Sequence, residues 1–213
     1  MSAPCLPIQQ PGAIAQAVIE LRAGNLVVVP TDTVYGVAVI PEALDAMVRT
    51  LYRPRQTAPW LALPLLLDSA AEATRLARLT PSAERLMRAF WPGVVTVILP
   101  AAPDFPFPLQ SPRIALRVPN SEPLRDLLRA MGGYLIVGRA ARSGFPSCIT
   151  AAEAVEQLGE LVSLILDGGP SPYGVISTVV DCVATPPAVV QRGAIPEERI
   201  LAALSSTAQE SCR

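Results

Sequence analysis

The fold is decided by one stretch, which reads Leu26-Val27-Val28-Val29-Pro30-Thr31-Asp32-Thr33-Val34-Tyr35-Gly36-Val37-Ala38. Its first four residues form an uninterrupted apolar run, which is typical of a strand buried on both faces. Pro30 ends this strand, because proline has no amide hydrogen to donate to a neighbouring strand. The stretch therefore predicts a buried strand whose end carries polar side chains.

The segment after Pro30 concentrates hydrogen-bonding groups. Two threonine hydroxyls, a carboxylate and a phenol precede Gly36 within six residues. Ligands of α/β proteins commonly bind at the ends of strands, which favours a binding site here. A plain polar turn, in which Gly36 only supplies backbone freedom, explains the composition equally well. Both interpretations stay open on composition alone.

Length and composition predict one folded domain. The chain has 213 residues, of which 51% are hydrophobic, so it is long enough to bury a sizeable core. No apolar run free of proline and charge reaches the length of a membrane span. No basic region precedes an apolar stretch near the first residue, as it would in a signal peptide. We therefore expect a cytoplasmic protein without a membrane partner.

The basic residues are unusual, because all 17 of them are arginine and the chain has no lysine or histidine. This excludes a lysine Schiff base, a catalytic histidine and a histidine metal site. Any bound anion must be held by arginine or by backbone amides. The four cysteines form no CxxC pair, so we expect free thiols and neither a zinc site nor a disulfide framework.

Apolar spacing predicts helices that alternate with strands. Helices are expected at residues 13–22, 41–52, 70–79, 81–90, 122–131 and 150–158. Strands are expected at residues 26–29, 64–67, 94–99, 114–118, 134–137, 162–166, 177–181 and 188–190. Thr80 is predicted as an N-cap, and Thr150 with Glu153 as a capping box. Short turns between some strands indicate a strongly twisted α/β sheet with mixed parallel and antiparallel pairs and helices on both sides.

Arg117 lies within one of these predicted strands, between apolar residues. A buried arginine must find a partner, because an unpaired buried charge is expensive. One interpretation is a salt bridge to a carboxylate of the core. The other is a bidentate clamp on the carboxylate of a substrate.

The segment from Pro30 to Gly36 resembles the signature of the YrdC/TsaC family, the L-threonylcarbamoyladenylate synthases. Further family-like segments follow in the family's order: Phe90-Trp91-Pro92-Gly93, Ala115-Leu116-Arg117-Val118-Pro119, Asp167-Gly168-Gly169-Pro170, Gly174-Val175-Ile176-Ser177-Thr178-Val179-Val180-Asp181 and Arg192-Gly193-Ala194-Ile195. The resemblance implies a YrdC-like fold with a concave cleft. The resemblance also implies that the YrdC-like domain spans residues 12–204. A loose lead-in at residues 1–11 precedes it, and a tail at residues 205–213 follows it.

The resemblance also implies a threonine site. Its residues are Thr33, Arg117 and Ser177, and further candidate contacts are Thr31, Asp32, Tyr35 and Asp68. Asp68 stands where the family usually has a histidine. No residue is assigned a catalytic role, and no protein-bound metal is expected.

The nucleotide side departs from the family pattern. Arg55 and Thr57 stand at the family's Lys-x-Arg, and Arg139 and Ala141 at its Ser-x-Asn. Gln191 replaces a further arginine. Arginine binds phosphate oxygens in a bidentate way. The candidate nucleotide contacts are Arg55, Arg113, Arg139 and Ser143.

The resemblance implies a nucleotidyltransferase that makes threonylcarbamoyladenylate from L-threonine, bicarbonate and ATP, with Mg²⁺ accompanying the ATP. Its product would feed the modification of the tRNA adenosine next to the anticodon, through downstream tRNA threonylcarbamoyl transferase proteins. Two other interpretations stay open. One is a non-catalytic, regulatory paralogue that binds an amino acid or nucleotide. The other is an RNA-binding module, although a net charge of −1 gives no broad basic footprint for RNA.

Overall fold

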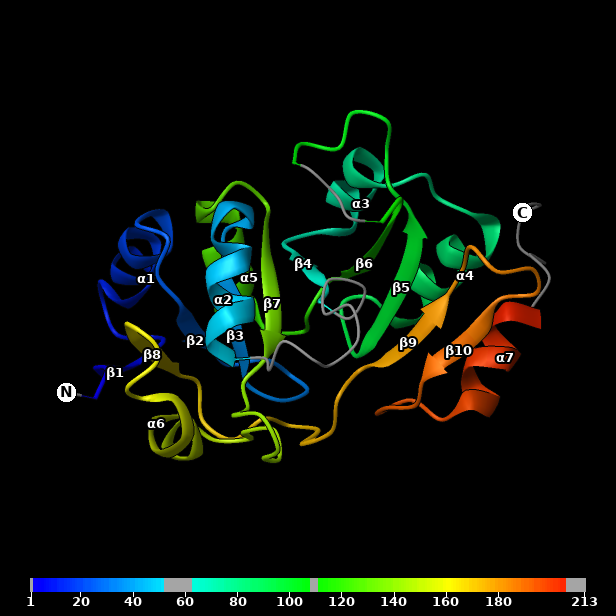
Figure 1. Cartoon of the computed structure of the whole chain (residues 1–213). Helices are drawn as coiled ribbons and strands as arrows, with labels where there is room; N and C mark the ends of the chain where they lie inside the picture. The colour runs from blue at the N-terminus through cyan, green and yellow to red at the C-terminus, as the bar shows by residue number, and fades with distance from the viewer. Residues whose placement is uncertain (1, 52–62, 108–110, 206–213) are drawn as a thin grey trace.

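The computed structural model describes residues 2–51, 63–107 and 111–205 (Figure 1). Ten strands form one sheet in the order β1-β8-β2-β3-β7-β4-β6-β5-β9-β10. The strands are β1 Cys5–Pro7, β2 Val27–Val29, β3 Gly36–Val39, β4 Leu65–Leu67, β5 Val95–Pro100, β6 Arg113–Arg117, β7 Tyr134–Arg139, β8 Leu164–Asp167, β9 Thr178–Asp181 and β10 Ala188–Gln191. The helices are α1 Ala13–Arg22, the 3-10 turn η1 Pro41–Ala43, α2 Leu44–Leu51, α3 Ala70–Leu76, α4 Pro81–Phe90, α5 Glu122–Ala130, α6 Ala151–Leu158 and α7 Glu197–Ser205.

The sheet is mixed and open, as the sequence predicts. Strand β8 pairs in parallel with both β1 and β2, and β4–β6 and β5–β9 are the other parallel pairs. The remaining neighbours, such as β2–β3 and β3–β7, are antiparallel. The two edge strands, β1 and β10, lie at opposite ends of the sheet (Figure 1).

Two apolar cores cover the two faces of the sheet. In β2, Val28 belongs to one core, and Val27 and Val29 belong to the other, because successive side chains of a strand point to opposite faces. Helices α1 and α5 pack on the second core, and α2, α4 and α6 pack on the first. The prediction of helices on both sides is therefore confirmed. The concave cleft stays a prediction.

Several elements match their predicted bounds. Helices α1 and α4 begin and end where the apolar spacing places them. Thr80 caps α4 by accepting a hydrogen bond from the Ala83 amide at 3.2 Å. Thr150 and Glu153 form the predicted capping box of α6.

Several elements differ from the expectation, including β3, which was not expected as a strand, and the predicted helix 41–52, which begins as the separate 3-10 turn η1. Helix α3 ends at Leu76, earlier than predicted, because Ala77 adopts an extended conformation and bridges Ala101. The stretch 1–11, expected to be a loose lead-in, contains β1, which pairs with β8. Helix α7 follows Arg192-Gly193-Ala194-Ile195, where no helix was expected.

Candidate functional site

The loop between β2 and β3, the site loop (residues 30–35), buries three polar side chains. Thr31, Asp32 and Thr33 are each at most 5% exposed. The Thr31 hydroxyl donates to the Val34 carbonyl at 2.6 Å and accepts from the Thr33 amide at 3.1 Å, which closes a tight turn. The structure therefore holds the polar side chains of this loop inside the protein rather than in solvent.

Arg117 reaches this loop from the end of β6. Its Nη1 donates to the Thr33 hydroxyl at 2.8 Å, and its Nη2 forms an ion pair with Asp32. Its Nε donates to the Gly93 carbonyl at 2.8 Å. Arg117 is only 4% exposed. Burial lowers the pKa of Arg117 because the charged form loses water, and the Asp32 carboxylate counteracts this by favouring that form.

Ser177 lies on the same face of the sheet, two strands away from Arg117. Strands β5 and β6 pair Val97 with Leu116, so Thr96 comes next in register opposite Arg117. The Thr96 and Ser177 hydroxyls are 2.9 Å apart, and both residues are buried. Ser177 thus contacts Thr96, whose position in β5 is opposite Arg117 in β6.

Tyr35 is fully buried and contacts a different part of the chain. Its hydroxyl donates to the Gly169 carbonyl at 2.7 Å and accepts from the Gly168 amide at 3.2 Å. Burial raises the pKa of Tyr35 to about 12, because the phenolate would lose its hydration. Tyr35 fastens the loop after β8 to the site loop, and its hydroxyl does not bond to Thr33 or Arg117.

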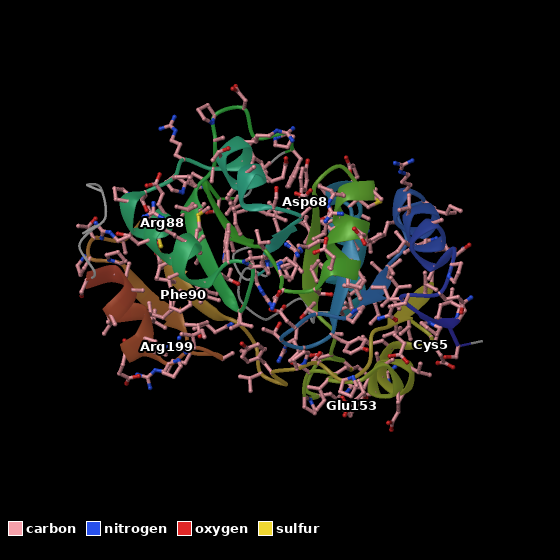
Figure 2. The ribbon with its side chains drawn as sticks, turned by 180° about the vertical axis from the view of Figure 1, so that it is seen from behind. Cys5, Asp68, Arg88, Phe90, Glu153 and Arg199 are labelled. Atoms are coloured by element: carbon pink, nitrogen blue, oxygen red, sulfur yellow. The ribbon has the colours of Figure 1, made fainter. Side chains whose placement is uncertain are left out.

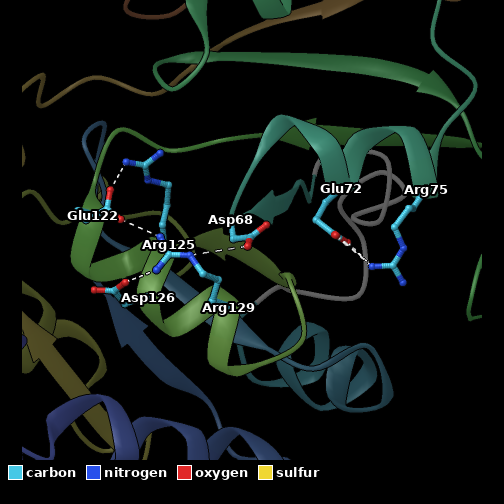
Figure 3. A network of polar contacts seen from close by, with 7 residues as sticks. All are labelled: Asp68, Glu72, Arg75, Glu122, Arg125, Asp126 and Arg129. Carbon is cyan, nitrogen blue, oxygen red and sulfur yellow. Dashed lines mark hydrogen bonds and ion pairs between the residues drawn. The ribbon is translucent and has the colours of Figure 1, made fainter.

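Asp68 takes part in a separate network on α5, drawn in Figure 3. Its Oδ2 lies 3.9 Å from Arg129 Nε, and Arg129 also binds Glu122 and Asp126. Figure 2 shows Asp68 in the upper half of the molecule and Glu153 at the bottom. The structure assigns Asp68 to this network and does not bond it to the Thr33–Arg117 pair.

The candidate nucleotide contacts come from separate places in the fold, because Arg139 ends β7 next to the β2–β3 loop, whereas Arg113 begins β6 at the opposite end of that strand from Arg117. Arg139 is exposed at the end of β7, where it pairs across the strands with Gly36. Its guanidinium has no hydrogen-bond or ion-pair partner among residues 2–51, 63–107 and 111–205. Arg113 forms a salt bridge to Asp181 at 2.8 Å. Ser143 is half-buried in a turn. Arg55 and Thr57 lie outside the described residues.

Three participants were missed by the sequence reasoning. The Gly93 carbonyl belongs to the family-like segment Phe90-Trp91-Pro92-Gly93, to which the sequence analysis assigns no role in the site. Thr96 is a polar residue between apolar neighbours of a strand, and that pattern was the available signal. The Gln191 side chain donates to the Ser177 carbonyl at 3.0 Å, so the residue that replaces the family's arginine helps to position Ser177.

The described residues contain neither a metal-binding cluster nor a membrane-spanning helix. No group of three or more His, Cys, Asp or Glu side chains in that part of the chain is placed to hold a metal ion. Likewise, none of its helices is long and apolar enough to cross a membrane.

Comparisons with known proteins agree on one family. The Sua5/YciO/YrdC family model, described as "Telomere recombination", matches residues 20–193. A putative threonylcarbamoyl-AMP synthase of Mycobacterium tuberculosis is 35% identical over 198 residues, which cover 91% of this chain and 90% of the relative. The threonylcarbamoyl-AMP synthase of Bacillus subtilis is 35% identical over 206 residues, which cover 90% of this chain and 56% of the relative.

A solved structure supports the same assignment. Pyrococcus abyssi Sua5 complexed with L-threonine matches with a TM-score of 0.85 and 28% identity, over 95% of this chain and 61% of that protein. Sequence, fold and the order of the motifs thus agree, and this chain belongs to the Sua5/YciO/YrdC family.

Proposed function

We propose that this chain is a threonylcarbamoyl-AMP synthase, a nucleotidyltransferase that condenses L-threonine, bicarbonate and ATP into threonylcarbamoyladenylate and pyrophosphate. Relatives that carry this name match nearly the whole chain, and a structural neighbour binds L-threonine. The observation that carries the proposal is the buried Arg117, which is hydrogen-bonded to Thr33 in the family's signature loop.

Arg117 has the unused donors that a threonine carboxylate needs. A guanidinium carries five N–H donors. Three of them bind Gly93, Thr33 and Asp32. The described residues leave one N–H unused on each of the two terminal nitrogens, Nη1 and Nη2. Two such donors can bind the two oxygens of one carboxylate. Thr33 and Ser177 would supply hydroxyls beside it.

ATP would bind with its Mg²⁺ on the Arg139 side of the loop. Arg139, Arg113, Ser143 and Arg55 are the proposed phosphate contacts. The reaction depends mainly on positioning the reactants and neutralising the triphosphate, so it requires no histidine. Arg139 pairs with Gly36 across the strands, and its guanidinium has no partner among the described residues, which supports this placement.

The product would be consumed by a transfer to RNA. Threonylcarbamoyladenylate is an activated acyl adenylate, and downstream tRNA threonylcarbamoyl transferase proteins would pass its acyl group to the tRNA adenosine next to the anticodon. We place this activity in the cytoplasm, where tRNA is modified. A net charge of −1 favours transfer by those partners over tight tRNA binding by this chain.

Pyrophosphate release tests the nucleotide side of the proposal. With L-threonine, bicarbonate and Mg-ATP, the parent protein should release pyrophosphate, and omitting threonine should stop it. Arg139→Ser should lower the rate by about 10-fold or more, because it removes a charge-assisted contact to phosphate. Arg142→Ser is the matched control, since it removes a neighbouring exposed arginine.

The Bacillus subtilis synthase serves as the positive control for this assay. No release by the parent, under conditions in which that enzyme turns over, would refute the enzymatic function. The regulatory interpretation would then take its place. Equal rates for the parent and Arg139→Ser would refute only the phosphate role of Arg139.

Calorimetry tests the threonine side. Arg117→Ala should abolish L-threonine binding, but it also leaves Asp32 buried without its counter-ion. Arg117→Lys keeps a positive charge for Asp32 and loses the planar fork, so it separates the two effects. We expect Arg117→Lys to weaken threonine binding by about 10- to 100-fold. Normal threonine affinity in either variant would contradict the clamp.

A further inference from the structure

Asp32 contains a buried carboxylate oxygen that its ion pair does not use. Its Oδ1 binds Arg117, whereas its Oδ2 has no hydrogen-bond partner within the described part of the chain. The side chain is 3% exposed, so bulk water does not reach it freely. Buried carboxylate oxygens are nearly always satisfied, because an unmet one costs free energy. The unmet oxygen therefore points to a donor supplied by a ligand.

The side chains around Asp32 Oδ2 indicate that the ligand's donor is positively charged. Asp32 Oδ2 lies on a carboxylate held against Arg117, which keeps two N–H groups free of described partners. The site thus presents a negative acceptor and a positive double donor from two adjacent side chains. This pattern complements a ligand in which a cation and a carboxylate are separated by a single carbon.

The other charged groups nearby do not disturb this pattern. Arg113 lies four residues before Arg117 on β6 and on the same face of the strand. Its charge is neutralised by Asp181, to which it forms a salt bridge at 2.8 Å. Asp167 of β8 lies 3.3 Å from the Tyr35 hydroxyl and 2.8 Å from the Gly169 amide. The backbone of Asp32 is itself fixed, because its carbonyl accepts from the Tyr173 amide at 3.0 Å.

We propose that Asp32 Oδ2 accepts a hydrogen bond from the α-ammonium group of the amino acid whose carboxylate Arg117 holds. Asp32 is then the residue that selects α-amino acids against carboxylic acids without the amine. This inference rests on the proposed function, since L-threonine is the ligand in question. It adds a negatively charged acceptor for the ammonium group, which the neutral hydroxyls of Thr33 and Ser177 and the cationic Arg117 do not provide.

A pair of ligands tests this role. L-threonine and (R)-3-hydroxybutanoate differ by the α-amine, and their affinities are measured by calorimetric competition. The parent should bind L-threonine about 10- to 100-fold more tightly, as expected for a hydrogen bond between charged groups. Asp32→Asn keeps an oxygen for Arg117 and replaces the second oxygen with an amide donor. This variant should bind L-threonine at most about threefold more tightly than (R)-3-hydroxybutanoate.

The ratio of the two affinities separates recognition from a structural effect. If Asp32 only orients Arg117, Asp32→Asn weakens both ligands equally and the preference persists, which overturns the proposal. Asp126→Asn, an equivalent change in an ion-paired carboxylate on α5, is the control and should keep the parent's ratio. Parent protein that binds neither ligand would overturn the proposed function as well.

A measurement on the parent alone covers the case in which Asp32→Asn does not fold. L-threonine affinity should fall as pH rises above the pKa of its own amino group, by about tenfold per pH unit in the limit, because only the ammonium form is accepted. The affinity for (R)-3-hydroxybutanoate should stay constant over the same range. A threonine affinity that does not change with pH would overturn the proposal.

Discussion

Gly193 lies against the backbone that carries Ser177. A Cβ at this position would come within 2.3 Å of the Ile176 carbonyl oxygen and the Ser177 carbonyl carbon. Neither backbone atom can move by a simple rotamer change. Gly193→Ala should therefore shift Ser177, weaken L-threonine binding, and destabilise the fold by about 1–3 kcal/mol. Denaturant unfolding and calorimetry measure both effects, and a variant indistinguishable from the parent would contradict this close approach.

Two buried thiols should make the free energy of unfolding depend on pH in the alkaline range. Burial raises the pKa of Cys148 to about 11 and that of Cys182 to about 12. The folded protein thus keeps protons that the unfolded chain releases, so the free energy of unfolding should decrease as pH rises above about 9. Urea unfolding between pH 8 and 10 should show a smaller decrease for the Cys148→Ala/Cys182→Ala double variant. Equal pH slopes would refute this origin.

Arg117 shows how far the sequence reaches at the scale of one residue. Its place among apolar residues predicts burial and a charged partner, but both a core carboxylate and a substrate remain possible from the sequence. The pairing with Asp32 depends on how β6 approaches the β2–β3 loop, which is long-range information. Asp68 shows the same limit, because the family resemblance makes it a candidate threonine contact, whereas its ion pair with Arg129 of α5 depends on long-range packing.

At the scale of elements, the N-terminus of α6 holds the segment beside the site loop. Glu153 Oε2 accepts from the amides of Ile149 and Thr150, and the neighbouring Cys148 carbonyl accepts from the Tyr35 amide at 2.9 Å. Thr150→Ala should cost about 1 kcal/mol of stability, because it removes the hydroxyl that accepts from the Glu153 amide.

Thr80→Ala provides the matched control for this substitution, since Thr80 caps α4 with the same 3.2 Å contact and no reciprocal glutamate. Both variants should lose similar stability in thermal unfolding. Only Thr150→Ala should also weaken L-threonine binding, because its helix adjoins the site loop. A change in binding for Thr80→Ala alone would contradict this assignment.

Elements with strong local signals could be predicted from the sequence, whereas a strand that depends only on its partner could not. Helices α1 and α4 have apolar periodicity, and α4 also has an N-cap and a first-turn proline. Strand β1 is three residues long and ends in proline, so only its partner β8 makes it a strand. Helix α3 was predicted too long because the Ala77–Ala101 bridge competes with its last turn.

At the scale of the whole molecule, β1 covers one edge of the sheet. The Ile8 amide donates to the Asp167 carbonyl at 2.7 Å, and the Ile165 amide to the Pro4 carbonyl at 2.9 Å. Deleting residues 2–8 would expose the edge of β8 and remove the buried Ile8. The melting temperature should drop by roughly 2–4 °C for each kcal/mol lost, and aggregation should increase. An unchanged melting temperature would show that β1 contributes no stability.

The position of β8 between β1 and β2 has a consequence for synthesis. Val27 pairs with Leu164, and Cys5 with Ile165, so both N-terminal strands depend on a partner from late in the chain. A chain emerges from the ribosome N-terminus first. The nascent chain therefore carries the apolar edge of Val27–Val29 unpaired until Asp167 has left the exit tunnel. A translational pause before β8 would therefore prolong the exposure of this hydrophobic strand.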